Sequence, residues 1–143
     1  MRLLLDINVW IALFDDAHFH NAQALALFQQ PKLKIATCAL TENGVLRVMN
    51  LPGYAKRAPP GFELVRQKLV LVCADVDHEF WPCSVSLRSE SVLNWNRIMG
   101  HNQITDAYLL ALAVHHGGAL ATFDQRVALS TVTAAEKHNL QLL

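Results

Sequence analysis

Short apolar runs bounded by polar residues recur along the chain, and each is typical of a strand buried in a sheet. Four runs are predicted as strands, at residues 3–5, 34–38, 119–123 and 140–143. The last is a possible edge strand. Residues 78–81 before Pro82 form a plausible short fifth strand, and the apolar residues 70–73 suit either a strand or the end of a helix.

Helical spacing of apolar residues predicts helices between these runs. A short helix through residues 9–13 follows the first strand directly. Five further helices are predicted with their boundary signals: residues 22–28 with Asp15 and Asp16 as caps, 41–49 capped by Thr41 and ended by residues 51–53, a helix from residue 62 opened by residues 59–61, 92–99 capped by Ser89, and 105–114 capped by Thr105 and ended by Gly117 and Gly118.

This alternation of strands and helices predicts an α/β fold, because parallel neighbouring strands need helical crossovers. We expect a three-layer α/β/α sandwich with a mostly parallel central sheet. A chain of 143 residues fits one domain with a substantial core, so residues 1–143 are predicted to form a single domain.

Composition narrows the class of protein only modestly. Twelve basic and twelve acidic residues balance, so the basic excess common among nucleic-acid binders is missing, although a local basic rim and bound cations can replace it. No apolar stretch reaches the roughly 20 residues that span a bilayer, and Asp6 interrupts the first apolar run too early for a signal peptide. We therefore expect a cytoplasmic protein, with Cys38, Cys73 and Cys83 as reduced, buried thiols.

Four acidic residues stand where a parallel sheet would bring them together. Asp6 and Asp124 each directly follow an apolar strand, and ligands bind beyond the carboxyl ends of strands in such sheets. Glu42 and Asp106 each follow a threonine at the start of a helix on the same side. We expect all four carboxylates to converge, and like charges at close range raise one another's pKa values and destabilise the fold.

A hard divalent cation compensates such a cluster, because Mg²⁺ prefers carboxylate and water oxygens. Water activated by the metal can attack a phosphodiester, while the metal neutralises the charge that develops on phosphorus. Asn8, two residues after Asp6, can hydrogen-bond a metal-bound water or a neighbouring carboxylate. The residues predict a metal-dependent phosphodiesterase without a protein nucleophile.

Five segments in order resemble the PIN-domain family, specifically the VapC-type toxins of VapBC toxin-antitoxin systems, over nearly the whole chain. They are residues 4–13 (LLDINVWIAL), 36–48 (ATCALTENGVLRV), 80–82 (FWP), 100–113 (GHNQITDAYLLALA) and 120–124 (LATFD).

The resemblance implies a Mg²⁺- or Mn²⁺-dependent endoribonuclease, usually homodimeric, that acts on RNA and is silenced by a cognate VapB-type antitoxin. It implies that Asp6, Glu42, Asp106 and Asp124 are the metal-binding acids, with the last contributing less directly. It also implies that Asn8 and Thr105 are the supporting polar residues, and that residues through Val70 are helical while residues 78–81 form a strand.

Other interpretations stay open at this point. Each acid taken singly can be a helix cap or a turn residue. A haloacid-dehalogenase-like phosphotransferase also has an aspartate after its first strand, but a second aspartate is usual where Asn8 stands here. A catalytically silent PIN-like module that only binds a partner is the other alternative. His18 and His20 alternate as metal ligands sometimes do, but surface histidines are the favoured interpretation.

The basic residues that contact RNA are the least determined part of the site. Four arginines are candidates by position and charge alone, and each also fits a solvated surface residue: Arg47, Arg57, Arg97 and Arg126. Trp81 and Trp95 are expected in a core or interface, and an exposed aromatic ring can also stack on an RNA base. For the antitoxin, we hypothesise that an arginine or lysine of a partner peptide enters the acidic pocket and displaces the metal.

Overall fold

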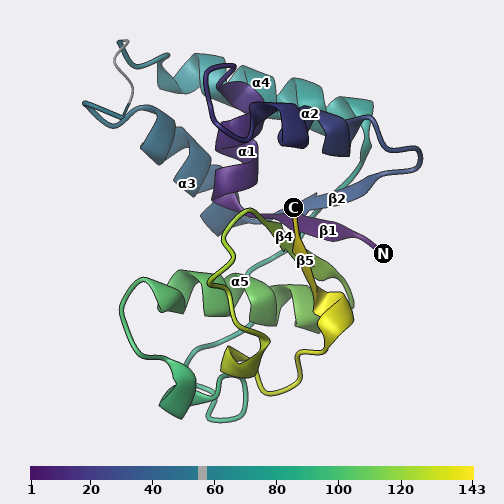
Figure 1. Cartoon of the computed structure of the whole chain (residues 1–143), viewed down its shortest axis with the longest axis vertical. Helices are drawn as coiled ribbons and strands as arrows, with labels where there is room; N and C mark the ends of the chain where they lie inside the picture. The colour runs from purple at the N-terminus through teal and green to yellow at the C-terminus, as the bar shows by residue number, and fades with distance from the viewer. Residues whose placement is uncertain (55–57) are drawn as a thin grey trace.

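The fold is built on a five-stranded parallel sheet. In the computed structural model, which describes residues 1–54 and 58–143, the strand order is β3-β2-β1-β4-β5 and each pairing between these strands is parallel (Figure 1). The strands are β1 (Leu3–Leu5), β2 (Lys34–Thr37), β3 (Asp77–Phe80), β4 (Ala119–Thr122) and β5 (Leu140–Leu142). The predicted parallel sheet is confirmed, and β5 lies at its edge as expected.

Helices cover both faces of this sheet. Helices α1 (Ile7–Phe14), α2 (Asn21–Phe28), α3 (Ala39–Met49) and α4 (Phe62–Asp75) lie on one side, and α5 (Gln103–His115) lies on the other (Figure 1). Three short 3₁₀ helices complete the described chain: η1 (Trp95–Arg97), η2 (Leu129–Thr131) and η3 (Lys137–Asn139). The predicted α/β/α sandwich is confirmed.

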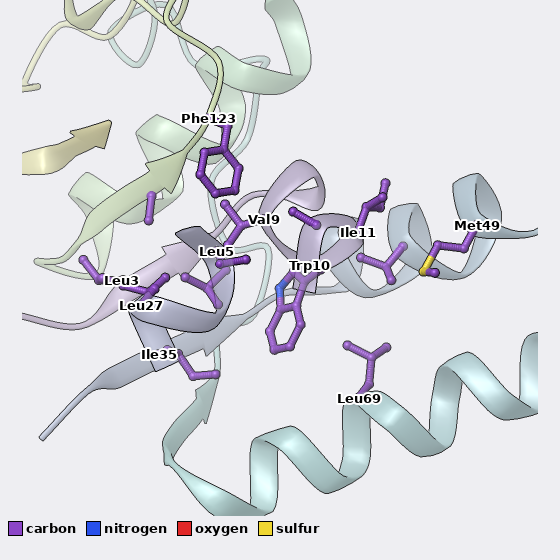
Figure 2. Close-up of a cluster of buried hydrophobic side chains, with 14 of the residues drawn as sticks. Leu3, Leu5, Val9, Trp10, Ile11, Leu27, Ile35, Met49, Leu69 and Phe123 are labelled. Atoms are coloured by element: carbon purple, nitrogen blue, oxygen red, sulfur yellow. The ribbon is translucent and has the colours of Figure 1, made fainter. Parts of the chain in front are cut away.

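Each face of the sheet has its own apolar core, because strands buried on both sides alternate their side chains between two layers. Leu5 of β1 packs with α1, and Figure 2 shows Trp10 of α1 beside Leu69 of α4 in this cluster. Leu4 faces the opposite layer, where it packs with residues of α5 such as Leu109. The sheet is therefore packed between two apolar cores, and these cores fix the position of the carboxyl end of β1.

The edge strand β3 is mostly exposed and owes its position to charge as well as to backbone pairing. Arg2 donates to the Ile35 carbonyl at 2.9 Å and to the Asp77 carbonyl at 2.7 Å, and its Nε pairs with Glu79 at 2.9 Å. This side chain therefore ties β1, β2 and β3 together. The segment left open by periodicity, residues 70–73, belongs to α4, and the strand implied at residues 78–81 is observed at Asp77–Phe80.

Several predicted helix caps are wrong. The N-cap of α3 is Cys38, and Thr41 lies inside the helix, where its Oγ1 accepts from the Cys38 N–H at 3.0 Å. The N-cap of α5 is Asn102, so Thr105 lies within the first turn. Asp15 instead ends α1, and α2 begins after His20. In each case the exact boundary depends on which backbone groups find partners in the folded chain.

Helix α2 packs through Ala24 and Leu27, while Leu25 is exposed. The prediction that all three thiols are buried is corrected. Cys38 is buried, but Cys83 is exposed and Cys73 is only half-buried.

No helix capped by Ser89 forms, and only the short η1 lies in that region. Asn94 donates its backbone N–H to the Thr131 carbonyl at 3.0 Å, and Leu93 forms a bridge with Val132. Because these backbone groups pair with a distant segment, they are not available for helical hydrogen bonds. Within the described residues, no helix is long and apolar enough to cross a membrane.

Candidate active site

Asp6 lies where β1 ends and α1 begins. It is the N-cap of α1, and its Oδ1 accepts from the Ile7 N–H at 2.7 Å. Only 6% of the residue is exposed. Burial raises the pKa of this carboxyl above its usual value, and the negative charge of Asp124 adds to the rise, while hydrogen bonds from Thr122, Ile7 and Asn8 oppose it.

A hydroxyl at the end of β4 connects the two strand-end acids. Thr122 Oγ1 donates to Asp6 Oδ2 at 2.7 Å and accepts from the Asp124 N–H at 3.0 Å. Asn8 Nδ2 donates both to Asp6 Oδ2 at 2.9 Å and to Thr122 Oγ1 at 2.8 Å, and its Oδ1 accepts from the Phe123 N–H at 3.2 Å. Asn8 therefore donates to a neighbouring carboxylate, as predicted, and it does so from the first turn of α1.

Asp124 follows β4 and is held by an arginine two residues later. Arg126 Nε donates to Asp124 Oδ1 at 2.9 Å and Nη2 donates to Oδ2 at 2.8 Å, while the Arg126 backbone N–H also donates to Oδ1 at 2.9 Å. These bonds keep the pKa of Asp124 below its usual value. Arg126, one of the predicted rim arginines, is thus a partner of a site acid in this structure.

Asp106 approaches the same place from the first turn of α5. Burial raises the pKa of its carboxyl to about 6, and the charges of Asp6 and Asp124 contribute to the rise. Asp106 and Asp124 line the same hollow, and Thr122 connects Asp124 to Asp6. The fold therefore places Asp6, Asp106 and Asp124, from three separate segments, near enough for their charges to interact.

Glu42 has a different set of contacts. It lies in the first turn of α3, and its Oε1 accepts from Thr37 Oγ1 at 2.7 Å. The same hydroxyl lies 2.8 Å from His78 Nε2. Because the single hydroxyl hydrogen goes to Glu42, the histidine must donate through Nε2. The structure therefore places Glu42 at the same edge of the sheet, one strand away from Asp6, with its carboxylate turned to Thr37 and His78.

The remaining predicted residues lie around this edge. Thr105 is exposed on α5 beside Asp106. Arg47 and Arg97 are exposed, while Arg57 lies outside the described residues. Among the residues that the structure describes, no three Asp, Glu, His or Cys side chains are already close enough to hold a metal ion. His18 and His20 belong to a surface loop, in agreement with the favoured interpretation, and Trp81 is buried while Trp95 is exposed.

An open hollow leads to two of the three acids. It has a volume of about 480 Å³, and its lining includes Gln103, Asp106, Asp124 and Arg126. A hollow with two acids at its wall and an arginine at its rim can admit a charged chain and a cation from solvent.

Sequence reasoning missed three partners of the acids. Thr122 and Thr37 each lie at the end of an apolar strand, and this position could have predicted that both lie near the acids. The pairing of Arg126 with Asp124 was available from their spacing of two residues. What no pattern indicated was the contact between Thr122 and Asn8, which lie 114 residues apart.

Comparison with known proteins identifies the family of the chain. The PIN domain model matches residues 3–133. The chain belongs to the PIN-domain family. It is 41% identical to the ribonuclease VapC44 of Mycobacterium tuberculosis over the full length of both chains. It is also 40% identical to the ribonuclease VapC38 of the same organism, over 87% of this chain and 86% of that one. Within the PIN family the chain is therefore of the VapC type.

Solved structures share the fold at low sequence identity. VapC20 of Mycobacterium tuberculosis, described as a sarcin-ricin loop cleaving toxin, superposes with a TM-score of 0.62 at 16% identity, covering 94% of this chain and 99% of that one. A chain of VapBC2 from Rickettsia felis, solved with a DNA fragment from their promoter, gives a TM-score of 0.51 at 18% identity, covering 88% and 90%. These PIN-domain neighbours share the α/β arrangement described above.

Proposed function

We propose that this PIN-domain protein is a metal-dependent endoribonuclease toxin that hydrolyses RNA phosphodiester bonds and is inhibited by a cognate VapB-type antitoxin. The full-length similarity to ribonucleases of the VapC type supports RNA cleavage within a toxin-antitoxin system. The observation that carries the proposal is the grouping of three acids: Thr122 hydrogen-bonds both the Asp6 carboxylate and the Asp124 N–H, and Asp106 and Asp124 line the same hollow. Burial and the neighbouring charges make Asp6 and Asp106 resist ionisation, whereas Asp124 is kept ionised by Arg126, and a cation would stabilise the cluster.

The donor set fits Mg²⁺ or Mn²⁺, because it offers carboxylate and hydroxyl oxygens and no thiolate. Asp6, Asp106 and Asp124 would hold the metal, with Glu42 after its carboxylate turns away from Thr37. When bound, the metal supplies an acidified water as nucleophile and neutralises the charge that develops on the phosphate.

The chain's own residues then orient the acids. Thr122 and Asn8 both donate to Asp6 Oδ2, which leaves this buried carboxylate one orientation. Asp106 is only half-buried, so it can release its proton to solvent when a cation arrives. We propose that Thr105, exposed beside it, contacts the substrate. These roles describe a positioning network around Asp6 and a more adaptable acid on α5.

Two other functions predict different results. A phosphotransferase of the haloacid dehalogenase type usually has an aspartate where Asn8 stands, and here that position donates a hydrogen bond to Asp6, which an ionised aspartate cannot do. A catalytically silent binding module would keep the fold but would not cleave RNA in any metal.

The proposed partners are the RNA substrate, the antitoxin and a second copy of the chain in the cytoplasm. We propose that a basic side chain of the antitoxin binds the acidic site, because Arg126 already makes this type of contact with Asp124. A homodimer is implied by the family resemblance and is testable by light scattering of the purified chain.

The central test is cleavage of total RNA by the wild type and by Asp106→Asn, each with Mn²⁺, with Mg²⁺ and with excess EDTA. We expect cleavage by the wild type with metal, none in EDTA, and a loss of at least about 100-fold in Asp106→Asn, since metal-site electrostatics contribute several kcal/mol to such reactions. Asp75→Asn is the matched control, because Asp75 is exposed at the end of α4.

Three outcomes would contradict the proposal. Cleavage that persists in EDTA would exclude the metal, and cleavage by Asp106→Asn at the wild-type rate would exclude this site. A wild type that binds RNA but never cleaves it would instead support the silent module.

A further inference from the structure

A stack of aromatic rings leads from the surface to Phe123, which lies between β4 and Asp124. The ring of His20 lies parallel to the ring of Phe123, with a centroid distance of 4.3 Å and an interplanar angle of 7°. Phe19 meets the ring of His20 edge-on, with its centroid 4.8 Å from that of His20. Phe123 is buried and Figure 2 shows it in the core cluster near Val9.

The outermost ring of this stack is almost fully in water. Phe19 is 89% exposed, more than any other large apolar side chain among the described residues. A phenyl ring in this position buries little apolar area, so it contributes little to the stability of the fold. It is therefore available to a ligand.

The loop that presents Phe19 is held in place by its own hydrogen bonds. The His20 N–H donates to His18 Nδ1 at 3.1 Å, and His20 Nδ1 lies 2.8 Å from Gln23 Oε1. Asn21 Nδ2 donates to the Ala12 carbonyl at 2.8 Å, which fastens the loop to α1. The ring platform is thus ordered before any ligand binds, which lowers the entropic cost of binding.

The stack is also continuous with the site of the acids. Phe123 stands between Thr122 and Asp124, and its N–H donates to Asn8, which donates to Asp6. His20 and Asn8 thus both contact Phe123, which places the loop beside the segment that carries Asp124. Asp15 accepts from the Ala17 N–H and from Tyr54 but keeps its negative charge, so both acids of the loop, Asp15 and Asp16, favour an uncharged base over a phosphate beside the rings.

We propose that Phe19 and His20 form a stacking ledge, which holds one unpaired base of the RNA substrate next to the acidic site. Every base has a π face, and single-stranded RNA is recognised largely by stacking of unpaired bases on aromatic side chains. The ledge selects single-stranded over paired RNA, because a base within a duplex cannot reach Phe19. This inference rests on the proposed ribonuclease function and assigns part of its substrate binding to the loop between α1 and α2.

The test measures RNA binding without cleavage. Fluorescence anisotropy of a labelled oligoadenylate is recorded in EDTA at low salt for the wild type, Phe19→Ala and Phe19→Trp. A stacked base contributes enough that its loss weakens binding roughly 5- to 150-fold in Phe19→Ala, whereas Phe19→Trp keeps the affinity within about twofold because its ring also stacks.

Two controls separate stacking from general damage. Phe62→Ala removes another exposed phenyl ring, on α4, and should leave the affinity unchanged. A ribose-phosphate oligomer without bases should bind the wild type and Phe19→Ala equally, because only the backbone charge remains. Thermal melting checks that Phe19→Ala is folded.

The ledge is overturned if Phe19→Ala binds oligoadenylate as the wild type does, if the wild type does not bind it at all, or if the baseless oligomer shows the same loss. A loss of antitoxin binding with RNA binding intact would assign Phe19 to a protein partner and would also overturn it. Since this assay needs neither metal nor cleavage, its failure is distinct from failure of the ribonuclease proposal, which Asp106→Asn tests.

Discussion

Arg126 binds both carboxylate oxygens of Asp124, at 2.9 and 2.8 Å. The guanidinium thus occupies the oxygens that a metal ion would use, and it lowers the pKa of this acid. Removing it should free the carboxylate and leave more negative charge at the site. We expect Arg126→Ala to bind Mn²⁺ about two- to fivefold more tightly than the wild type. The effect is small because the ion pair that is removed is exposed to solvent. Isothermal titration calorimetry measures the affinity.

Arg126→Lys is the matched control, because lysine keeps the charge but cannot form the two-pronged contact. Its Mn²⁺ affinity should lie between those of the wild type and Arg126→Ala. Weaker Mn²⁺ binding by Arg126→Ala would show that the arginine supports the metal site and does not compete with it.

The raised pKa of Asp106 predicts that stability of the metal-free protein falls as pH rises. The unfolded chain loses this proton near 3.8 and the folded chain near 6, so between these values the folded state binds more protons. The free energy of unfolding should therefore fall as pH rises through this window and then level off. We expect a loss of about 1–2 kcal/mol, after discounting for solvent screening of a half-exposed group.

Urea unfolding in EDTA at several pH values measures this slope. Asp106→Asn should remove the part of the pH slope that is due to Asp106. This variant should be more stable than the wild type above a pH of about 6. The raised pKa of Asp6 acts with the same sign, so part of the slope should remain. Equal slopes in the wild type and Asp106→Asn would show that neither burial nor the neighbouring acids raise the pKa of Asp106 in the folded chain.

Thr122 is predicted to hold Asp6 through its hydroxyl. Thr122→Val keeps the shape but removes the donor to Asp6 and the acceptor for Asn8 and for the Asp124 N–H. Because Thr122 is fully buried, the free energy of unfolding should fall by about 1–3 kcal/mol in Thr122→Val. Mn²⁺ affinity should fall as well, because Asp6 loses a bond that favours its charged form.

Thr122→Ser retains the hydroxyl and should restore the Mn²⁺ affinity, with stability reduced only by the missing methyl group. Calorimetry and urea unfolding of both variants separate the two effects. If Thr122→Val bound Mn²⁺ like the wild type, Thr122 would have a structural role alone.

Gly118 is predicted to be required by close packing before β4. A Cβ at this position would lie 2.6 Å from the Arg2 carbonyl oxygen and 2.5 Å from Trp81 Cη2. Because the first contact is with backbone, Gly118→Ala should reduce the free energy of unfolding by about 1–3 kcal/mol. Gly100→Ala is the control, since a Cβ at Gly100 would meet nothing within 4 Å, and it should change stability by less than about 0.5 kcal/mol.

The placement of Asp6 and Asp124 could be predicted because it depends on local pattern alone. An apolar run that ends in an aspartate places this residue at the end of a strand, and parallel strands put their ends at one edge. The same reasoning located Asp106 and Glu42 in first helical turns, although it chose the wrong capping residues. A cap depends on which backbone N–H lies within reach, and sequence specifies that only to within one or two residues.

The helix predicted after Ser89 failed for a different reason. Apolar residues at helical spacing are equally compatible with an irregular segment whose side chains enter a core. Leu93 is buried in the layer beneath α5, and the backbone around it pairs with residues near Val132. That partner lies far along the chain, so no local pattern could indicate it.

The sequence by itself determined the alternating order of elements, the parallel sheet and the edge at which the acids gather, because hydrophobic periodicity and strand ends are local properties. Only the tertiary structure decided the contacts of each carboxylate. Asp6 meets Thr122 across 116 residues, Glu42 turns to Thr37, and Asp124 is bound by Arg126. Side-chain orientation depends on which donors the folded chain brings within about 3 Å, and hydrogen bonds act only at that range.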